Sequence, residues 1–581
     1  MLKTEPKARA TRKPADPAAE APPGLVALSG LAVRRAVAVA VGRLGGALWH
    51  RTLTGTPGRI VFAPETVTAA DPDIAADIYA GVFSLAGRTV DTQGQSPFTV
   101  APPTLDWAAE LHSFSWLVHL DATPSALSTS NAVALLDEWV AAPESSKGVA
   151  VRPGIVAERL TAFLVMSPVL LDGADNARRL AFMRLLGRHM RRLERAVAVE
   201  ETPLTALRVI GALALAGTVI ADQARLQRWA LAVLGDTLKR QILPDGGHKG
   251  RAPDAVVSAL SILVPLKLAL ERRQQTVPKS VSGSIDKLFP MLRFFAHADG
   301  ALAVFQGSRN VAADEVATLL ALDDAKGRPT QNARYSLYQR LAAGPSVALF
   351  DMGVLPPPAF AERSSAGVLA IEFSSGGQRI VTGCGPLSAV DPGWAVAARM
   401  GAAASTLTID NRSPARLLRW PVLTRVFGAI AFAGPGRVDI ARKGLTASAR
   451  HDGYLPRFGV THERALELSD DGLALTGHDR LIGQDRLSGT PFAIRFHLMP
   501  KIAVRVDKAR QNAMLTLPDG AIWLFQVRSG PALAVEETIV ATAPGRARRA
   551  AQIVIHGNTL TDERVSWQIA RRSGPLSESP P

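Results

Sequence analysis

The chain has 581 residues, 47% of them hydrophobic and 20% charged, with a formal net charge of +15. This length exceeds one ordinary core and predicts two folded units, and the composition is that of a globular protein rather than a disordered or membrane-embedded one. The single cysteine, Cys384, excludes an internal disulfide framework and a cysteine-rich metal site. The basic balance favours polyanionic partners such as nucleic acid, anionic lipid or acidic polysaccharide, although coding bias towards arginine would produce the same charge.

Both ends of the chain are predicted to be disordered tails. Residues 1–24 are basic and rich in proline, and no apolar stretch of the kind found in a secretory signal follows them. Residues 573–581 are rich in serine and proline. Between about 28 and 50, arginines are spaced along an apolar stretch, a pattern compatible with a helix that touches a membrane surface.

Two classes of partner are not expected. No basic run is interleaved with aromatic residues, and only four tyrosines occur, so the sequence predicts no nucleic-acid partner. The longest apolar runs, 209–221 and 255–266, fall short of the roughly 18–20 residues that cross a bilayer. They predict buried helices and no transmembrane segment.

From about residue 25 to 345 the hydrophobic pattern is helical. Apolar residues recur at spacings of three and four, most clearly over 180–195, and prolines separate the helices. Many helices of similar length joined by short loops predict helical hairpins arranged in a toroid or a bundle. The other helices are expected over 131–142, 205–216, 226–241 and 285–295, with breaks at Pro153, Pro203, Pro244 and Pro278.

Near residue 345 the hydrophobic period changes from 3.6 to 2. Short alternating segments follow, and Asp471-Gly472 and Asp519-Gly520 suit the hairpin turns between them. Many strands without intervening helices predict an antiparallel β-sandwich over 346–572. The strands are expected within 368–374, 406–410, 437–442, 465–468, 492–498, 513–517, 522–528, 553–556 and 565–570.

Three segments resemble the heparinase II/III family of polysaccharide lyases. They are residues 243–254 (LPDGGHKGRAPD), 365–385 (SAGVLAIEFSSGGQRIVTGCG) and 399–410 (RMGAAASTLTID). The resemblance implies an α/α toroid followed by an antiparallel β-sandwich, which agrees with the pattern of the elements. The predicted fold class is therefore α+β and multidomain, with an all-α toroid at 25–345 and a sandwich at 346–572.

The resemblance also implies an activity. Family members cleave uronic-acid polymers by β-elimination, in which a base removes the proton at C5 and a neutralising group stabilises the carboxylate of the carbanion. The substrate lies in a cleft between toroid and sandwich. Family members act mostly in the periplasm or cell envelope; because no signal peptide is visible, a cytoplasmic location is the alternative.

In the toroid, the family's substrate-neutralising loop corresponds to residues 243–254. Pro253 suits the first position of a helix and Asp254 its first turn, so His248 and Arg251 would lie at a helix N-terminus, where an anion is favoured. The resemblance implies that both contact the substrate. The alternative is a tight glycine turn in which His248 is an ordinary loop residue.

In the sandwich, the family positions carry other residues. The two histidines of the family fall at Arg363 and Ser365, the aspartate at Gly383, and the last histidine at Ala404. Hydroxyl, hydrogen and methyl side chains cannot replace imidazole and carboxylate ligands, so no zinc and no other cofactor is expected. Arg363 stays protonated and could pair with a substrate carboxylate but cannot act as a base.

The candidate acid or base is therefore a tyrosine. Tyr338 and Tyr454 are the leading candidates, supported by His451 beside Tyr454. Tyr335 lies three residues before Tyr338, which would place both on one face if this segment is helical, and Tyr335 is expected to bind substrate. For each tyrosine the alternative is a buried aromatic residue with a bonded hydroxyl.

The predicted function is that of a metal-free carbon–oxygen lyase acting on an acidic polysaccharide. The alternative is a catalytically degenerate protein that binds polysaccharide or takes part in envelope assembly, since several family positions are changed together. A third hypothesis, a glycosidase in the toroid, would require two opposed carboxylates in one cleft.

Overall fold

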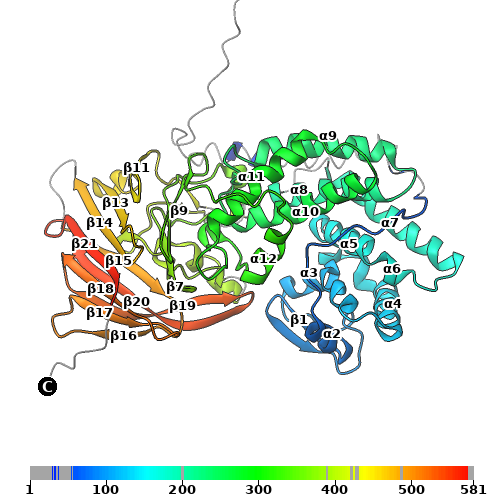
Figure 1. Cartoon of the computed structure of the whole chain (residues 1–581), viewed down its shortest axis with the longest axis horizontal. Helices are drawn as coiled ribbons and strands as arrows, with labels where there is room; N and C mark the ends of the chain where they lie inside the picture. Colours follow the sequence, from blue (N-terminus) through cyan, green and yellow to red (C-terminus); the bar gives the residue numbers. More distant parts are fainter. Residues whose placement is uncertain are drawn as a thin grey trace, which may run out of the picture.

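The computed structural model describes residues 29–30, 32–33, 37, 54, 57–197, 202–387, 390–418, 420, 423–424, 431–483 and 489–572. The predicted tails at 1–24 and 573–581, and most of the predicted membrane-contact segment at 28–50, lie outside these residues. Within the described ranges, no helix combines the length and the apolar character needed to cross a membrane. Figure 1 shows a helical domain beside a β-sandwich, with α11 and α12 close to the strands.

The helical domain confirms the predicted pattern of helices separated by prolines. Pro153 and Pro203 are the first residues of their helices. Pro278 immediately precedes the helix that begins at Lys279. The helices are α2 (Pro72–Tyr79), α3 (Leu105–Ser113), α4 (Ala126–Ala141), α5 (Pro153–Val165), α6 (Ser167–Leu170), α7 (Asn176–Val197), α8 (Pro203–Val219), α9 (Ala224–Gln241), α10 (Asp254–Arg272), α11 (Lys279–Phe295) and α12 (Ala313–Ala321).

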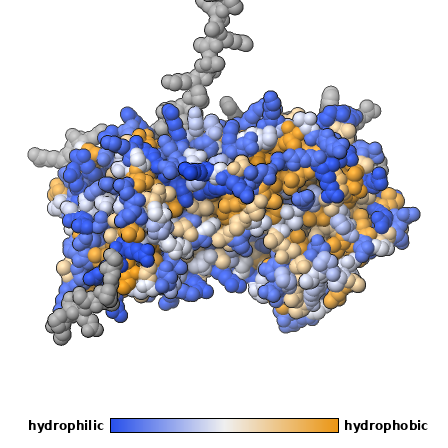
Figure 2. All heavy atoms as spheres, in the orientation of Figure 1, coloured by the Kyte–Doolittle hydropathy of each residue, from blue (hydrophilic) through white to orange (hydrophobic). Residues whose placement is uncertain are grey.

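Helix α8 lies in the interior of this domain. Its residues from Val209 to Val219 are all buried, and it packs against α5, α7, α9 and α10. A helix that is apolar all round needs neighbours on every side, which is why the run at 209–221 forms a core helix. On the face drawn in Figure 2, hydrophobic residues gather mainly over the helical domain.

One hairpin interrupts the segment that was predicted to be helical. Strands β1 (Val82–Leu85) and β2 (Arg88–Asp91) pair antiparallel around Ala86 and Gly87. Both turn residues have positive φ, 46° and 72°, as a tight two-residue hairpin turn requires. Strands of four residues are too short to show a period of 2 against a helical background.

The sandwich consists of two antiparallel sheets. One sheet has the order β11-β12-β13-β14-β21-β18-β17-β16, and the other has the order β19-β20-β15-β7-β6-β5-β4-β3, with β8 also paired to β15. The strands are β3 (Asn332–Ala333), β4 (Tyr338–Ala343), β5 (Ser346–Asp351), β6 (Ile371–Ser375), β7 (Gln378–Thr382), β8 (Leu407–Ile409), β11 (Val438–Lys443), β12 (Thr446–His451), β13 (Val460–Leu468), β14 (Ala474–Gly483), β15 (Pro491–Leu498), β16 (Ala503–Val506), β17 (Asn512–Thr516), β18 (Ile522–Ser529), β19 (Leu533–Ala543), β20 (Arg546–Asn558) and β21 (Arg564–Arg571). A short β9 (Arg416–Leu417) pairs with β10 (Ala431–Phe432), and a helical turn, α14 (Leu455–Phe458), precedes β13.

Aromatic side chains fill the space between the two sheets. The ring centroids of Phe496 on β15 and Trp567 on β21 lie 4.7 Å apart, and those of Phe373 on β6 and Trp523 on β18 lie 5.5 Å apart. All four residues are buried. These pairs join the inner faces of the sheets, as expected of a sandwich.

The strands begin earlier than the change predicted near residue 345. β3 and β4 already belong to the second sheet, with Ala333 opposite Tyr338. The predicted helical face carrying Tyr335 and Tyr338 is therefore wrong: residues 334–337 form a turn, with Leu337 at φ 60°, and Tyr338 begins a strand. A spacing of three cannot distinguish a helix from a turn followed by a strand.

Candidate functional site

The loop between α9 and α10 is fastened to the start of the sandwich. The Asp245 carboxylate accepts hydrogen bonds from the backbone N–H groups of Tyr335 and Ser336, both at 2.8 Å, and from Gly247 at 3.1 Å. Gly246 has φ +87°, and a Cβ there would lie 2.1 Å from the Lys287 carbonyl oxygen. The loop therefore requires glycine and holds a fixed shape at the boundary of the two domains.

His248 is buried inside this loop with both ring nitrogens engaged. Nδ1 accepts a hydrogen bond of 2.9 Å from the N–H of Gly250, so Nε2 carries the proton and donates to Gln241 Oε1 at 3.3 Å. Burial, and then the positive charge of Arg363, lower the pKa of His248 to about 4. The ring is therefore neutral near pH 7, and its polar atoms point to the protein itself.

Arg251 forms an ion pair inside the protein. Its guanidinium pairs with Asp351 and donates to the carbonyl oxygens of Ser336 at 3.0 Å and Val354 at 2.8 Å. It also lies 4.7 Å from the ring centroid of Tyr338. With 5% of its side chain exposed, Arg251 joins α10 to the sandwich and has no face turned to solvent.

Arg363 likewise meets a carboxylate of the protein. Its two terminal nitrogens lie 2.7 and 3.0 Å from the oxygens of Asp254, the first residue of α10. The Asp254 side chain is 3% exposed and that of Arg363 is 29% exposed. The arginine that was expected to pair with a substrate carboxylate is thus held by a bidentate pair within the chain.

The tyrosines do not reach a common cleft. Tyr338 is fully buried, and its hydroxyl donates to the carbonyl of Arg251 at 2.8 Å. The hydroxyl of Tyr454, buried in the sandwich, donates to Leu407 O at 2.9 Å. Burial raises the pKa of both hydroxyls, so both stay protonated near pH 7 and neither supplies the deprotonated form that a base requires. Tyr335 is half-buried beside Asp245.

His451 lies in the sandwich interior, away from the loop at 243–253. Its Nδ1 accepts from Gly453 N at 3.1 Å, and its Nε2 lies 3.4 Å from His462 Nδ1. His462 in turn contacts Asp479 at 2.7 Å, where Arg464 also binds. The structure therefore brings His248, Arg251, Arg363, Tyr335 and Tyr338 to the domain boundary, and it separates Tyr454 and His451 from them.

The three changed metal positions do converge in space. Ser365, Gly383 and Ala404 all line one cavity of about 40 Å³. Among the side chains around it, Asp351 is paired with Arg251 and Glu372 with His297, and the described part of the chain holds no group of three His, Cys, Asp or Glu placed to bind a metal. These residues do not fit a zinc ion.

A buried network between the domains was not anticipated. His297, which follows α11, contacts Glu372 on β6 at 2.9 Å and Ser374 Oγ at 2.9 Å. Arg379 approaches the same carboxylate at 3.5 Å. Burial raises the pKa of Glu372 to about 7. Nothing in the local sequence indicates that His297 meets the strand, because its contacts with Glu372 and Ser374 span 75 and 77 positions along the chain.

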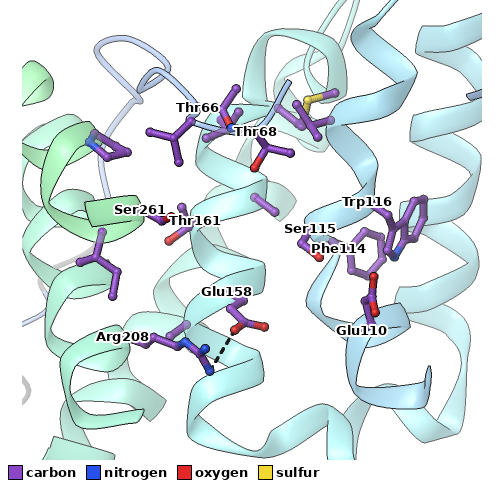
Figure 3. A pocket seen from close by; sticks show the side chains of 18 of the residues that line it. Thr66, Thr68, Glu110, Phe114, Ser115, Trp116, Glu158, Thr161, Arg208 and Ser261 are labelled. Atoms are coloured by element: carbon purple, nitrogen blue, oxygen red, sulfur yellow. Dashed lines mark hydrogen bonds and ion pairs between the residues drawn. The ribbon is translucent and has the colours of Figure 1, made fainter. Parts of the chain in front are cut away.

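A second and much larger cavity lies within the helical domain. Its volume is about 590 Å³, and its walls include α3, α5, α8 and α10. Figure 3 shows Glu110 and Glu158 on opposite sides of it, with Glu158 paired to Arg208 at 3.3 Å. None of the site residues predicted from the sequence lines this cavity.

A helical toroid joined to a two-sheet antiparallel sandwich is the architecture of heparinase-type lyases. Residues 325–568 match the family model described as heparinase II/III-like, C-terminal. This region is therefore a heparinase II/III-like domain, and both the predicted resemblance and the predicted fold class are confirmed.

Solved structures share this fold across nearly the whole chain. A crystal structure of heparinase III superposes with a TM-score of 0.67 at 14% identity, covering 96% of this chain and 94% of that one. The heparan sulfate lyase HepC from Pedobacter heparinus gives 0.53 at 16% identity, covering 95% and 90%. At these identities the likeness establishes the fold alone.

A curated protein is similar along most of its length. FtsZ-localized protein C of Caulobacter vibrioides is 28% identical over 542 residues, which cover 88% of this chain and 90% of that protein. The similarity thus includes both the helical domain and the sandwich.

Proposed function

We propose that this chain is a catalytically degenerate relative of the lyases that acts in cell-envelope assembly at the division site. The observation that carries this proposal is the set of ion pairs at the domain boundary. Arg251 and Arg363, the groups expected to neutralise a substrate carboxylate, are paired with Asp351 and Asp254 of the chain itself.

The cost of freeing these groups argues against β-elimination. If Arg363 turned to a substrate, the buried Asp254 carboxylate would lose its partner, and breaking a buried pair costs about 3–5 kcal/mol. A base is also lacking among the candidates. His248 has both nitrogens bonded, and the hydroxyls of Tyr338 and Tyr454 donate to backbone carbonyls.

The similarity to FtsZ-localized protein C supports the setting. That protein is named for its localisation with FtsZ, and the alignment covers about nine tenths of both chains. If the two proteins share a cellular position as well as both domains, the chain needs the lyase-like fold but not the lyase reaction. Residues at the domain boundary could then serve a structural role. We therefore infer that the chain belongs to the envelope-assembly machinery.

Imaging in a bacterial host tests this function. A fusion of the full chain to a reporter that fluoresces only in the cytoplasm should form a band that coincides with FtsZ and disperses when FtsZ is depleted. The reporter alone is the control. A uniform signal that ignores FtsZ would contradict recruitment, and a dark fusion with an envelope-localised epitope would place the chain in the periplasm and exclude direct contact with FtsZ.

A further inference from the structure

The cavity in the helical domain has its own chemistry, separate from the boundary loop. Carboxylates outnumber guanidinium groups in its lining although the whole chain carries a charge of +15. Arg208 pairs with Glu158, and Arg309 pairs with Glu315. These pairs neutralise both arginines and leave the carboxylates of Glu65 and Glu110 in excess.

Glu110 is the carboxylate that a ligand would meet inside the cavity. One of its oxygens accepts a hydrogen bond of 2.6 Å from the N–H of Ala86 in the β1–β2 turn, which fixes the side chain. No ion pair forms at Glu110 within the described ranges. Burial raises its pKa, and the charge of Glu158 adds to this, although the hydrogen bond from Ala86 and the charge of Arg309 act in the opposite direction. A bound cation would relieve this unfavourable charge, whereas a uronic-acid carboxylate would add to it.

The rest of the lining combines hydroxyl groups with an apolar wall. Figure 3 shows hydroxyl side chains distributed around the cavity, on the segment before α2, on η2 (Ser115–Asp121), on α5 and on α10; they are Thr66, Thr68, Ser115, Thr161 and Ser261. The apolar part includes Leu215, Ile262 and Pro265. A sugar presents hydroxyl groups at its edge and C–H groups on its faces, so such walls suit it, and the volume is typical of ligand pockets.

We propose that this cavity binds an oligosaccharide that carries a free amino group, with the ammonium held by Glu110 and the sugar hydroxyls by the threonine and serine side chains. The choice of a glycan rests on the proposed role in envelope assembly, and the amino group rests on the charges of the cavity. The expected ligand is thus opposite in charge to the substrate of a heparinase-like lyase.

Calorimetric titration of the full chain tests the proposal with three probes. They are glucosamine oligomers with free amines, the same oligomers fully N-acetylated, and uronic-acid oligomers. The free amines should bind at least about tenfold more tightly than the acetylated oligomers, as expected when a charge-assisted hydrogen bond is lost. Equal affinity for the two, or tighter binding of the uronic acids, would overturn the proposal.

Two variants locate the binding. Glu110→Gln should weaken the free-amine oligomer at least about tenfold and leave the acetylated oligomer unchanged. The matched control is Glu138→Gln, the same change at an exposed position of α4 outside the cavity. If Glu110→Gln does not fold, Thr161→Val should weaken both oligomers.

Full affinity in a folded cavity variant would overturn the assignment, as would a lysine-rich peptide that binds more tightly than the sugar. Recruitment by FtsZ is read out separately by imaging. A failure of this proposal is therefore distinguishable from a failure of the proposed function.

Discussion

Arg251, which the sequence predicts to contact substrate, forms a buried ion pair within the protein. It sits at positive φ, 62°, and its guanidinium occupies the space next to Gly353, where a Cβ would lie 2.0 Å from the arginine Cζ. Asp351, its ion-pair partner, also accepts from Gln306 Nε2 at 2.8 Å and from Gly353 N at 3.0 Å. These contacts of Arg251 and Asp351 are all made with other groups of the protein.

Removing the partner of Arg251 should destabilise the fold strongly. Asp351→Ala leaves a buried guanidinium without its counter-ion, and we expect a loss of about 3–5 kcal/mol in the free energy of unfolding, measured by urea denaturation. Asp137→Ala is the control, because it removes the exposed partner of Arg178 and should cost less than about 1 kcal/mol. Similar losses for the two variants would contradict a structural role for the buried pair.

The buried imidazole of His248 predicts a dependence on pH. Its pKa falls from 6.5 to about 4 on folding. The stability that the neutral imidazole contributes is therefore fully present above pH 6.5 and is lost as the pH falls towards 4. The difference in unfolding free energy between the native chain and His248→Gln should therefore shrink by about 3 kcal/mol over this window. A difference that stays constant between pH 7 and 4 would show that His248 is accessible to protons in the folded state.

At the scale of elements, the loop between α9 and α10 depends on a single glycine. Gly246→Ala would place a methyl group 2.1 Å from Lys287 O at φ +87°, and we expect a loss of at least about 1–3 kcal/mol in stability. The matched control is Gly283→Ala within α11, where a Cβ would meet nothing within 4 Å. That change should stabilise the chain by about 0.5–1 kcal/mol, and a loss there equal to that of Gly246→Ala would refute the steric argument.

The elements that the sequence predicts well are those with a long, regular hydrophobic period. Helices α7 and α9 and strands β15, β18 and β21 each carry several repeats of one period, so their type and position follow from the pattern alone. The β1–β2 hairpin and β3 are too short to do so. The positions of Ser365, Gly383 and Ala404 could be matched to the family because their order along the chain survives, and they do converge.

The partners of the site residues could not be predicted from the sequence. Arg251 and Asp351 are 100 positions apart, and Arg363 and Asp254 are 109 apart, so nothing local indicates that each arginine meets a carboxylate of the chain. The same holds for the cavity, where Glu110 and Glu158 come from α3 and α5. Motifs locate a residue type on an element, whereas its contacts depend on the tertiary structure.

At the scale of the whole molecule, the two domains also touch away from the loop at 243–253 and from the His297 network. The tip of the β1–β2 hairpin meets the turn between β19 and β20, where a Cβ on Gly545 would lie 2.4 Å from Ala86 O. Arg88 on β2 also donates to Val390 O at 2.6 Å. These contacts fix the sandwich against the helical domain and position Ala86, which in turn holds Glu110 in the cavity.

Disturbing the contact between the two hairpin tips should loosen both hairpins. Gly545→Ala should increase amide hydrogen exchange in residues 82–91 as well as in the β19–β20 turn, because the two tips can no longer approach. Gly520→Ala is the matched control: it also has positive φ, but a Cβ there would meet nothing within 4 Å. Its effect should stay within its own turn, and unchanged exchange at 82–91 in Gly545→Ala would contradict the contact.

The most direct test of the account is an assay for β-elimination. The purified full chain is incubated with a panel of uronic-acid polysaccharides, with heparinase III as the positive control, and the ultraviolet absorbance of unsaturated uronate is followed. Because the candidate acid, base and neutralising groups are bound within the protein, the account predicts no increase above the buffer blank on any polymer. An increase that is lost in Arg363→Ala, with the fold retained, would contradict it and show that the boundary residues perform the lyase reaction.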